Sequence, residues 1–361
     1  MLPEVFKEFL NGIFNPIVYT VLGILGFVMA LLFYRVWTKP KIALSILIVA
    51  AIFFLASAPD PNFRKIITKP DNVPIVALIF VLGFFTWLSL RQAAINDERI
   101  EKGLPPREAE EANDRVLVWP DLVYQELISM VIFTVILVVW SILLKAPLED
   151  PANPGKTPNP SKAPWYFLGL QEMLVYFDPW IAGVVLPSMI ISGLMAVPYC
   201  DKNPKGMGYY TLKERPFAII TFLFGFIILW VLLIIMGTFL RGPNWNFFGP
   251  YEKWDPHKLE SLTNVNLSEY FWVRWLGKGV PEHWLLREMP GIVVTILYLA
   301  VLPPMLAFTI CKKLVQQIGW IRYSIVIGHV IVMAGMLIKM ILRWTINLKY
   351  VVFIPEYFFN I

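Results

Sequence analysis

The stretch FAIITFLFGFIILWVLLIIMGTFL, residues 217–240, runs on without a single charged side chain. A helix needs about 20 mainly apolar residues to cross the hydrocarbon core of a bilayer, so this stretch predicts a transmembrane helix. The rest of the chain has a similar composition, because 57% of its 361 residues are hydrophobic and only 16% are charged. These proportions are typical of an integral membrane protein that crosses the bilayer several times.

Other apolar runs lie on both sides of this stretch, and together they predict an all-α integral membrane protein with about eight transmembrane helices. The predicted spans are residues 17–37, 42–57, 75–90, 122–144, 180–197, 217–240, 292–311 and 320–342. Residues 1–14 are acidic and amphipathic rather than basic, and the apolar run that follows has full length. We therefore expect no cleaved signal peptide, and the first run should remain as a span.

Basic residues between the predicted spans indicate which side of the membrane each loop faces. If the spans alternate in direction, these residues fall on one side, and the positive-inside rule assigns that side to the cytoplasm. They are Arg35, Lys39, Lys41, Lys202, Lys205, Lys213, Arg215, Lys312, Lys313, Arg322 and those of the segment 91–115. The loops at 58–74, 145–179 and 241–290 and both termini are then expected on the outer face. Topology and anionic lipids explain the net charge of +5 without a nucleic-acid partner.

Changes in composition divide the chain into four regions. Residues 1–92 hold three predicted spans of unassigned role, and residues 93–118 form a charged cytoplasmic linker in which two adjacent prolines should break a helix. Residues 119–240 hold three further spans with a short helical loop on the outer face. Residues 241–361 hold a long outer loop rich in Trp, Phe and Tyr, followed by two more spans. The aromatic residues of that loop predict either an interfacial belt or a docking surface for a peripheral partner.

The chain lacks the residues that hold redox groups within a membrane. Of its three histidines only His329 lies in a predicted span, so the chain cannot supply a pair of axial haem ligands. Cys200 and Cys311 have no CxxC or CxxCH pattern and predict neither a thiolate metal site nor a covalently bound haem. No nucleotide-binding or hydrolase motif is present. Any haem or iron–sulfur group that this protein works with is therefore expected on partner chains, and no metal site is expected here.

A few ionisable residues lie within the predicted spans and permit a different interpretation. Glu126 lies early in the fourth span, and His329 and Lys339 lie in the last. Such residues can mark an ion or proton pathway. The alternative is structural: Lys339 extends outward with Arg343 to the interface, and His329 hydrogen-bonds a neighbouring carbonyl.

Several motifs follow one another in an informative order. The sequence VWPDLVYQEL, residues 118–127, opens a predicted span, and PANP at 151–154 and APWY at 163–166 follow in the outer loop. An Arg–Pro pair, Arg215–Pro216, then introduces a later span. In order and spacing these motifs resemble the C-terminal half of cytochrome b, and especially subunit IV of cytochrome bc-type quinol oxidoreductase complexes, over about residues 119–240. The additional spans on both sides imply an enlarged prokaryotic variant in the cytoplasmic membrane.

The resemblance implies a share in a quinol-oxidising site on the outer face. The chain would be a subunit of a quinol–cytochrome c oxidoreductase of the translocase class that ligates no haem and is not active alone. Its expected partners are a haem b-carrying subunit of the cytochrome b N-terminal type, a Rieske-type iron–sulfur protein and a c-type cytochrome. One alternative is a haem-free membrane scaffold or anchor of a redox complex. A weaker one is an ion or proton transporter built on Glu126, His329 and Lys339.

The family motif Pro-Glu-Trp-Tyr is altered in this chain at its proton-accepting residue. Ala163 and Pro164 stand at the Pro and Glu positions, and proline cannot accept a proton. The residues expected to line the quinol site are Pro164, Trp165, Tyr166, Phe167 and Leu168. Either the loop is only scaffolding, or another residue supplies the base.

Glu172 is the candidate for that base. It follows Trp165 by two helical turns, about 10 Å along nearly the same face, and Tyr166 could donate a hydrogen bond to the quinol. The alternative for Glu172 is a solvated or salt-bridged helix residue. Asp178, directly before Pro179, is interpreted as a helix cap.

A second candidate site lies on the cytoplasmic side. Asp121 matches an acidic position near the quinone-reducing site of the family, and Glu126 follows it in the fourth span. The resemblance implies proton delivery to a reduced quinone, whereas the structural alternative is capping of the first helical turn by an acid.

Overall fold

The computed structural model describes residues 2–110, 116–144, 151–202, 208–260 and 263–361. Within this part of the chain, seven helices are long and apolar enough to cross a membrane. They are α4 (Pro40–Ser57), α6 (Val73–Glu101), η2 with α8 (Val118–Leu143), η4 with α10 (Ile181–Cys200), α11 to η6 (Pro216–Leu240), α14 to α15 (Trp284–Phe308) and α17 (Trp320–Ile346). An eighth is formed if α1 (Glu4–Ile13) and α2 (Pro16–Leu32), bent by 77° relative to each other, count as one span. The predicted all-α membrane fold with about eight spans is confirmed.

Shorter elements connect the spans. They are α3 (Tyr34–Trp37), α5 (Pro61–Ile67), α7 (Arg107–Glu110), η3 (Trp165–Phe167), α9 (Leu168–Met173), η7 (Pro243–Trp245), α13 (Leu267–Glu269), η8 (Tyr270–Trp275), α16 (Lys312–Ile318) and η10 (Pro355–Tyr357). The span α11 to η6 is built from α11 (Pro216–Leu223), η5 (Phe224–Val231), α12 (Leu232–Ile235) and η6 (Met236–Leu240). The strands β1 (Phe353–Ile354) and β2 (Phe359–Asn360) form a small antiparallel pair near the C-terminus.

The third span is much longer than the apolar run that predicts it. The helix α6 continues through residues 91–101, across the expected boundary between residues 92 and 93 and into the charged linker. It ends before Gly103, whose φ of +74° suits glycine, and α7 begins directly after Pro106. The break therefore falls at the predicted prolines. Arg115 of this linker lies outside the described residues.

The seventh span also begins earlier than predicted. Its helix α14 (Trp284–Ile296) starts inside the expected outer loop, and Arg287 and Glu288 in its first turns are hydrogen-bonded to each other. Arg287 also pairs with Glu356 near the C-terminus, at 2.9 Å. Polar contacts hold these turns in a helix that the apolar run alone did not predict.

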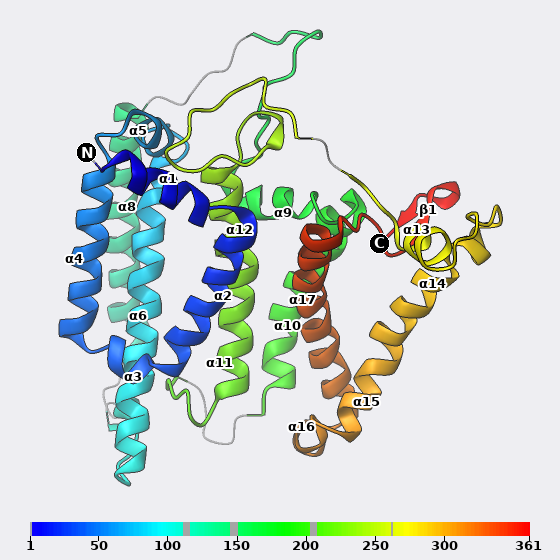
Figure 1. The fold of residues 1–361 in the computed structure, drawn as a ribbon. Helices are drawn as coiled ribbons and strands as arrows, with labels where there is room; N and C mark the ends of the chain where they lie inside the picture. The colour runs from blue at the N-terminus through cyan, green and yellow to red at the C-terminus, as the bar shows by residue number, and fades with distance from the viewer. Residues whose placement is uncertain (1, 111–115, 145–150, 203–207, 261–262) are drawn as a thin grey trace.

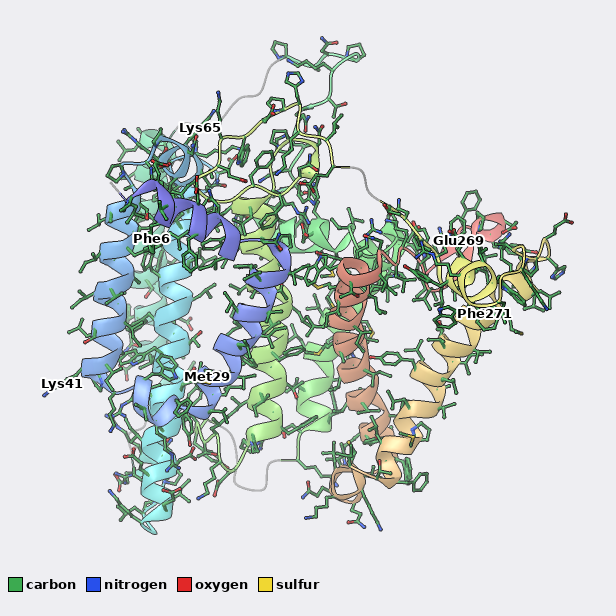
Figure 2. The ribbon with its side chains drawn as sticks, in the orientation of Figure 1. Phe6, Met29, Lys41, Lys65, Glu269 and Phe271 are labelled. Atoms are coloured by element: carbon green, nitrogen blue, oxygen red, sulfur yellow. The ribbon has the colours of Figure 1, made fainter. Side chains whose placement is uncertain are left out.

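The loops gather at two ends of the bundle as the alternating topology requires. In Figure 1, α1, α5, α9 and both termini lie toward one end, and α3, α16 and the last turns of α6 lie at the other. Figure 2 shows Lys41 and Lys65 toward these opposite ends. Which end faces the outer side of the membrane stays a prediction. Lys205, one of the basic residues used for that prediction, lies outside the described residues.

The main core lies where the short helix α9 meets three of the spans. Met173 and Tyr176 pack there with Ile228, Leu233 and Met340, all almost fully buried. The hydroxyl of Tyr19 in α2 donates to the carbonyl of Leu232 at 3.2 Å. Because α2 contacts the same span as α9 does, the N-terminal spans are packed directly onto the segment that resembles cytochrome b.

Tyr251 joins the N-terminal region to the long loop that follows residue 240. Its hydroxyl lies 2.7 Å from Ser57 Oγ, its carbonyl accepts from Asn62 at 3.0 Å, and its N–H donates to Asn11 Oδ1 at 3.0 Å. Three elements of the N-terminal region, α1, α4 and α5, therefore meet on one residue of the loop.

The helix α8 (Val123–Leu143) differs from the other spans because no residue in it is buried. Its side chains are apolar on all faces, with Glu126 in the first turn. Within the described residues this span contributes nothing to the core, so its faces remain available to lipid or to another protein.

Candidate functional site

A short helical segment lies across the end of the bundle toward which both termini lie, beside α12 (Figure 1). The segment starts with η3 after Pro164 and continues as α9 to Met173. Gln171 fastens the preceding loop to it, because its side chain accepts from Ala163 N and donates to Ser161 O, both at 2.9 Å. The helical loop expected after Pro164 is present, but it ends well before Asp178.

Two glycines let this segment approach the span α11 to η6 closely. A Cβ at Gly237 would lie 2.9 Å from the carbonyl oxygen of Leu168, and one at Gly169 would lie 3.3 Å from Ile234 Cγ1. Contacts shorter than 3.0 Å are not compatible with a real side chain, so Gly237 is required by the position of the outer helix.

A buried ion pair lies under the segment. Glu172, with 0% exposure, accepts from Arg241 Nη2 at 2.6 Å and from Arg241 Nε at 2.9 Å. Tyr176 and Trp245 donate to the same carboxylate at 3.2 Å each. The structure thus shows the salt-bridged alternative for Glu172.

The charge of Arg241 is stabilised by this arrangement. Burial opposes the charge, but the attraction and hydrogen bonds of Glu172 outweigh burial and raise the pKa of Arg241. Burial also raises the pKa of Tyr176 well above its ordinary value. Both neighbours therefore keep their protons, and Glu172 is held as the acceptor of their hydrogen bonds.

Lys162 is a functional candidate that the sequence did not reveal. Its Nζ donates to the carbonyl of Thr238 at 2.8 Å and lies 5.2 Å from the ring centre of Trp254. Burial lowers the pKa of Lys162 to about 7, helped by the charges of Lys69 and Arg241 and opposed by that of Glu172. The available signal was a lysine directly before the aromatic motif, the second of two lysines after the PANP motif.

Two hollows adjoin the segment. An open cavity of about 320 Å³ on the surface is lined by Asn159, Pro160, Ser161, Gln171, Leu174, Val175 and Trp245. A narrow apolar crevice is lined by Ile75, Leu78, Ile79, Leu82, Trp165, Trp230, Val231, Ile234 and Ile235. Since the first four of these belong to α6, the N-terminal spans form one wall of the crevice in which Trp165 lies.

The side chains of the predicted quinol-site residues point in two different directions. Trp165 is partly buried in the crevice and Leu168 is buried against the neighbouring span. Pro164, Tyr166 and Phe167 are exposed, and the rings of the last two lie 4.7 Å apart. The segment thus presents two aromatic rings outward while Trp165 points into the protein.

The predicted cytoplasmic-side residues lie away from these groups. Asp121 in η2 and Glu126 in α8 are both exposed. A buried acid at the opposite end from α9 is Asp97 near the end of α6, which accepts from the Tyr34 hydroxyl at 2.6 Å and from Lys213 N. Asp97 was not identified from sequence because it lies within a run of charged residues.

The ionisable residues of the last span make structural contacts. His329 Nδ1 lies 2.7 Å from the carbonyl of Ile325, and Nε2 lies 3.0 Å from Ser192 Oγ. Lys339 and Arg343 are both buried and donate to backbone carbonyls, including those of Lys349 and Asn347. The expectation that these two extend outward to the interface is wrong, because carbonyls at the end of the helix satisfy them inside the protein.

Asp178 lies at the start of the fifth span, but its carboxylate does not cap the helix as predicted. Its carbonyl accepts from the N–H groups of Ile181 and Ala182, both at 3.0 Å, at the start of the fifth span. Its carboxylate accepts instead from Asn360 at 2.9 Å and lies 3.4 Å from the Tyr350 hydroxyl. Asp178 therefore ties the C-terminal segment to this span.

Across the described ranges, no group of three or more His, Cys, Asp or Glu residues could hold a metal ion.

The fold and the site define a multi-pass helical membrane protein with a short helix packed across one end of its spans. Residues 151–251 match the family model described as cytochrome b(C-terminal)/b6/petD. The resemblance to the C-terminal half of cytochrome b is confirmed for this segment. The segment does not include the motif VWPDLVYQEL at 118–127, and it extends beyond residue 240. Residues 147–150, between the fourth span and the matched segment, lie outside the described residues.

Two curated relatives cover part of the chain. A menaquinol:cytochrome c reductase cytochrome c subunit of Geobacillus thermodenitrificans is 26% identical over 120 residues, which are 31% of this chain and 48% of the relative. A cytochrome b of Trichophyton rubrum is 30% identical over 125 residues, which are 33% of this chain and 32% of the relative. The chain thus spans about half of one relative and a third of the other. No solved structure matches the chain significantly.

Proposed function

We propose that this chain is a membrane subunit of a bc-type quinol–cytochrome c oxidoreductase and forms part of its quinol-oxidising site. The observation that carries the proposal is Trp165 in an apolar crevice at one end of the bundle, within the segment that matches cytochrome b. A quinol ring requires an apolar, aromatic-lined slot with a few polar groups at its edge, and this crevice, with a volume of about 10 Å³, would have to widen to admit one. The name of one relative, a menaquinol:cytochrome c reductase subunit, supports the same substrate class.

The residues of this chain would bind and orient the quinol. Trp165 would form an apolar wall for the ring, and Leu168 is buried behind it against the neighbouring span. Tyr166 faces outward, so its hydroxyl would meet a quinol oxygen only outside the crevice. Pro164 starts the helix and Phe167 covers its outward side. The ion pair of Glu172 and Arg241 holds the segment in place, since opening it would leave two charges buried. For this reason we assign Glu172 a positioning role, in place of the proton-accepting one considered from sequence.

Electrons removed from the quinol would leave through partner chains. A haem b and an iron–sulfur centre bound to partner subunits would supply the two one-electron acceptors. The histidines of this chain do not fit a haem, because His257 and His283 lie outside the spans and both ring nitrogens of His329 are in hydrogen-bond contact. We therefore assign haem b, the Rieske-type centre and the c-type cytochrome to partners.

The unpacked helix α8 supports such a partner. An apolar span with Glu126 in its first turn would leave a carboxylate beside lipid unless another protein covers it. We propose that the haem b-carrying subunit packs against α8, where Asp121 and Glu126 would take part in a cytoplasmic-side quinone or proton site. The complex would lie in a prokaryotic cytoplasmic membrane, with α9 and both termini on the outer side.

Purification in mild detergent together with its partners tests this function directly. A reduced-minus-oxidised spectrum of haem b, carried by a co-purifying polypeptide, is expected. A chain isolated alone, without haem and active in another assay, would contradict the proposal. The scaffold alternative is favoured by Pro164, which stands at the position of the family's acid. It predicts a haem-containing complex in which substitutions of crevice residues leave the rate of quinol oxidation unchanged.

Replacing Trp165 by alanine is expected to raise the KM for quinol, or the Kd of a quinol-site inhibitor, by about tenfold to a hundredfold. Loss of one large apolar contact is worth roughly 1.5–3 kcal/mol, and each 1.4 kcal/mol is a factor of about ten. Steady-state kinetics and inhibitor titration on the purified complex measure the change. Trp275→Ala is the matched control, because this tryptophan is 71% exposed on η8. An unchanged KM in the Trp165 variant would favour the scaffold.

A further inference from the structure

Lys162 lies just beyond one end of the apolar crevice. Its Nζ is hydrogen-bonded to the carbonyl of Thr238, which follows the crevice residues Ile234 and Ile235 on the same span. Three to four residues of helix are about one turn, or roughly 5 Å, toward the end where α9 lies. Trp165, one of the two aromatic residues that line the crevice, follows Lys162 closely in sequence. The amine therefore lies about one helical turn beyond the apolar crevice.

The surroundings of this amine contain unpartnered polar groups. Thr238 Oγ1 and Trp254 Nε1 are buried and have no hydrogen-bond partner within the described residues. Both belong to residues that Lys162 already contacts. Buried polar groups are normally paired, so a hydroxyl, an indole N–H and an amine in one neighbourhood indicate a place for a small polar group such as a water or a quinol oxygen.

The charges that act on Lys162 favour its neutral form. Arg241 after η6 and Lys69 before α6 repel a positive charge at Nζ, while Glu172 on α9 attracts it but is already bound to Arg241. Together with burial this lowers the pKa of Lys162 to about 7. An ordinary lysine, with a pKa near 10.4, is almost fully protonated at neutral pH, whereas this one can accept a proton there.

We propose that Lys162 is the proton-accepting residue of the quinol site in this chain, replacing the carboxylate whose position Pro164 occupies. The proposal rests on the proposed function. The neutral Nζ takes the proton of one quinol hydroxyl as its O–H bond breaks, and one electron passes to an iron–sulfur or haem acceptor on a partner subunit. The resulting ammonium stays bound to the Thr238 carbonyl and the face of Trp254. It then releases its proton to water in the surface cavity, which the adjacent Ser161 lines.

The first test measures the proton affinity of Lys162 without any turnover. Because its pKa is about 7 when folded and near 10.4 when unfolded, the unfolded state binds more protons between these values. The Tm of the wild-type complex in detergent should therefore rise relative to that of Lys162→Met as pH increases from about 7 toward about 10. Below pH 7 the difference should be constant. A difference that does not change with pH across this window means that Lys162 stays protonated, and it would overturn the proposal.

The second test is the pH profile of quinol oxidation by the intact complex. Lys162→Met should lower kcat/KM by about a hundredfold, the usual effect of losing a general base. Lys162→Arg should be equally impaired because its guanidinium keeps its proton, whereas Lys162→His should restore part of the rate, which should then fall on the acidic side as pH drops below about 6.5. The matched control is Lys253→Met, a change at an exposed lysine of the same loop as Trp254.

The outcomes separate this inference from the proposed function. If Lys162→Met oxidises quinol at the wild-type rate while Trp165→Ala does not, the quinol site stands and Lys162 is not its base. If neither change affects a complex that contains haem b, the quinol site itself lies elsewhere and both proposals fail.

Discussion

Replacing Glu172 by glutamine is expected to destabilise the folded protein by about 3–5 kcal/mol, the usual cost of breaking a buried ion pair on one side. The carboxylate is fully buried and receives two hydrogen bonds from Arg241, so its removal leaves a buried guanidinium without a counter-charge. A thermal melt of the complex in detergent measures the loss as a lower Tm. The control is Glu282→Gln, at an exposed position of the outer loop, which should melt like the wild type.

A second substitution tests whether the loss comes from the unpaired charge. Arg241→Gln alone should be similarly harmful, whereas the double variant Glu172→Gln with Arg241→Gln should recover much of the lost stability. If Glu172→Gln instead melts like the wild type but oxidises quinol slowly, the positioning role is wrong and Glu172 takes part in proton transfer.

Replacing Gly237 by valine is expected to displace the outer helix and to reduce quinol oxidation more than tenfold. Even the first added carbon would lie 2.9 Å from the carbonyl of Leu168, a backbone atom that cannot move aside alone. Overpacking of this kind costs about 1–3 kcal/mol, and part of that cost can be relieved by moving α9, which carries Trp165 and Leu168 with it. Both KM and Tm are measured. A raised KM with little change in Tm shows that the substitution affects the site more than the stability of the fold.

The control for this change is Gly83→Val in α6, where an added carbon meets no other atom within 4 Å. It should leave both stability and KM close to those of the wild type. A Gly237→Val variant that binds quinol normally would show that the position of α9 does not matter to the site.

The membrane fold could be predicted because its signals are local. A run of about 20 apolar residues is long enough to cross a bilayer wherever it occurs, and the predicted spans were confirmed on that basis. The start of the outer helix after Pro164 is also a local signal, since proline suits the beginning of a helix. The limits of α6 were missed because charged residues end an apolar run without ending a helix, which here stops just before Gly103.

The candidate site could be predicted only in part. The aromatic motif at 163–166 pointed to the outer helix, but the sequence left two roles open for Glu172. Arg241, which decides between them, lies 69 residues further along the chain, directly after a span. The wall that α6 contributes to the crevice was also unpredictable, because residues 1–92 showed no resemblance that could place them beside Trp165.

By itself, the sequence determined that this is a helical membrane protein with about eight spans, that its middle segment resembles the C-terminal half of cytochrome b, and that the usual acid is absent at Pro164. Only the tertiary structure decided which charges are buried together: Glu172 with Arg241, and Lys162 beside the Thr238 carbonyl and the ring of Trp254. The physical reason is that apolar length is a property of consecutive residues. Pairing and proton affinity depend instead on distances and burial among residues far apart in the chain.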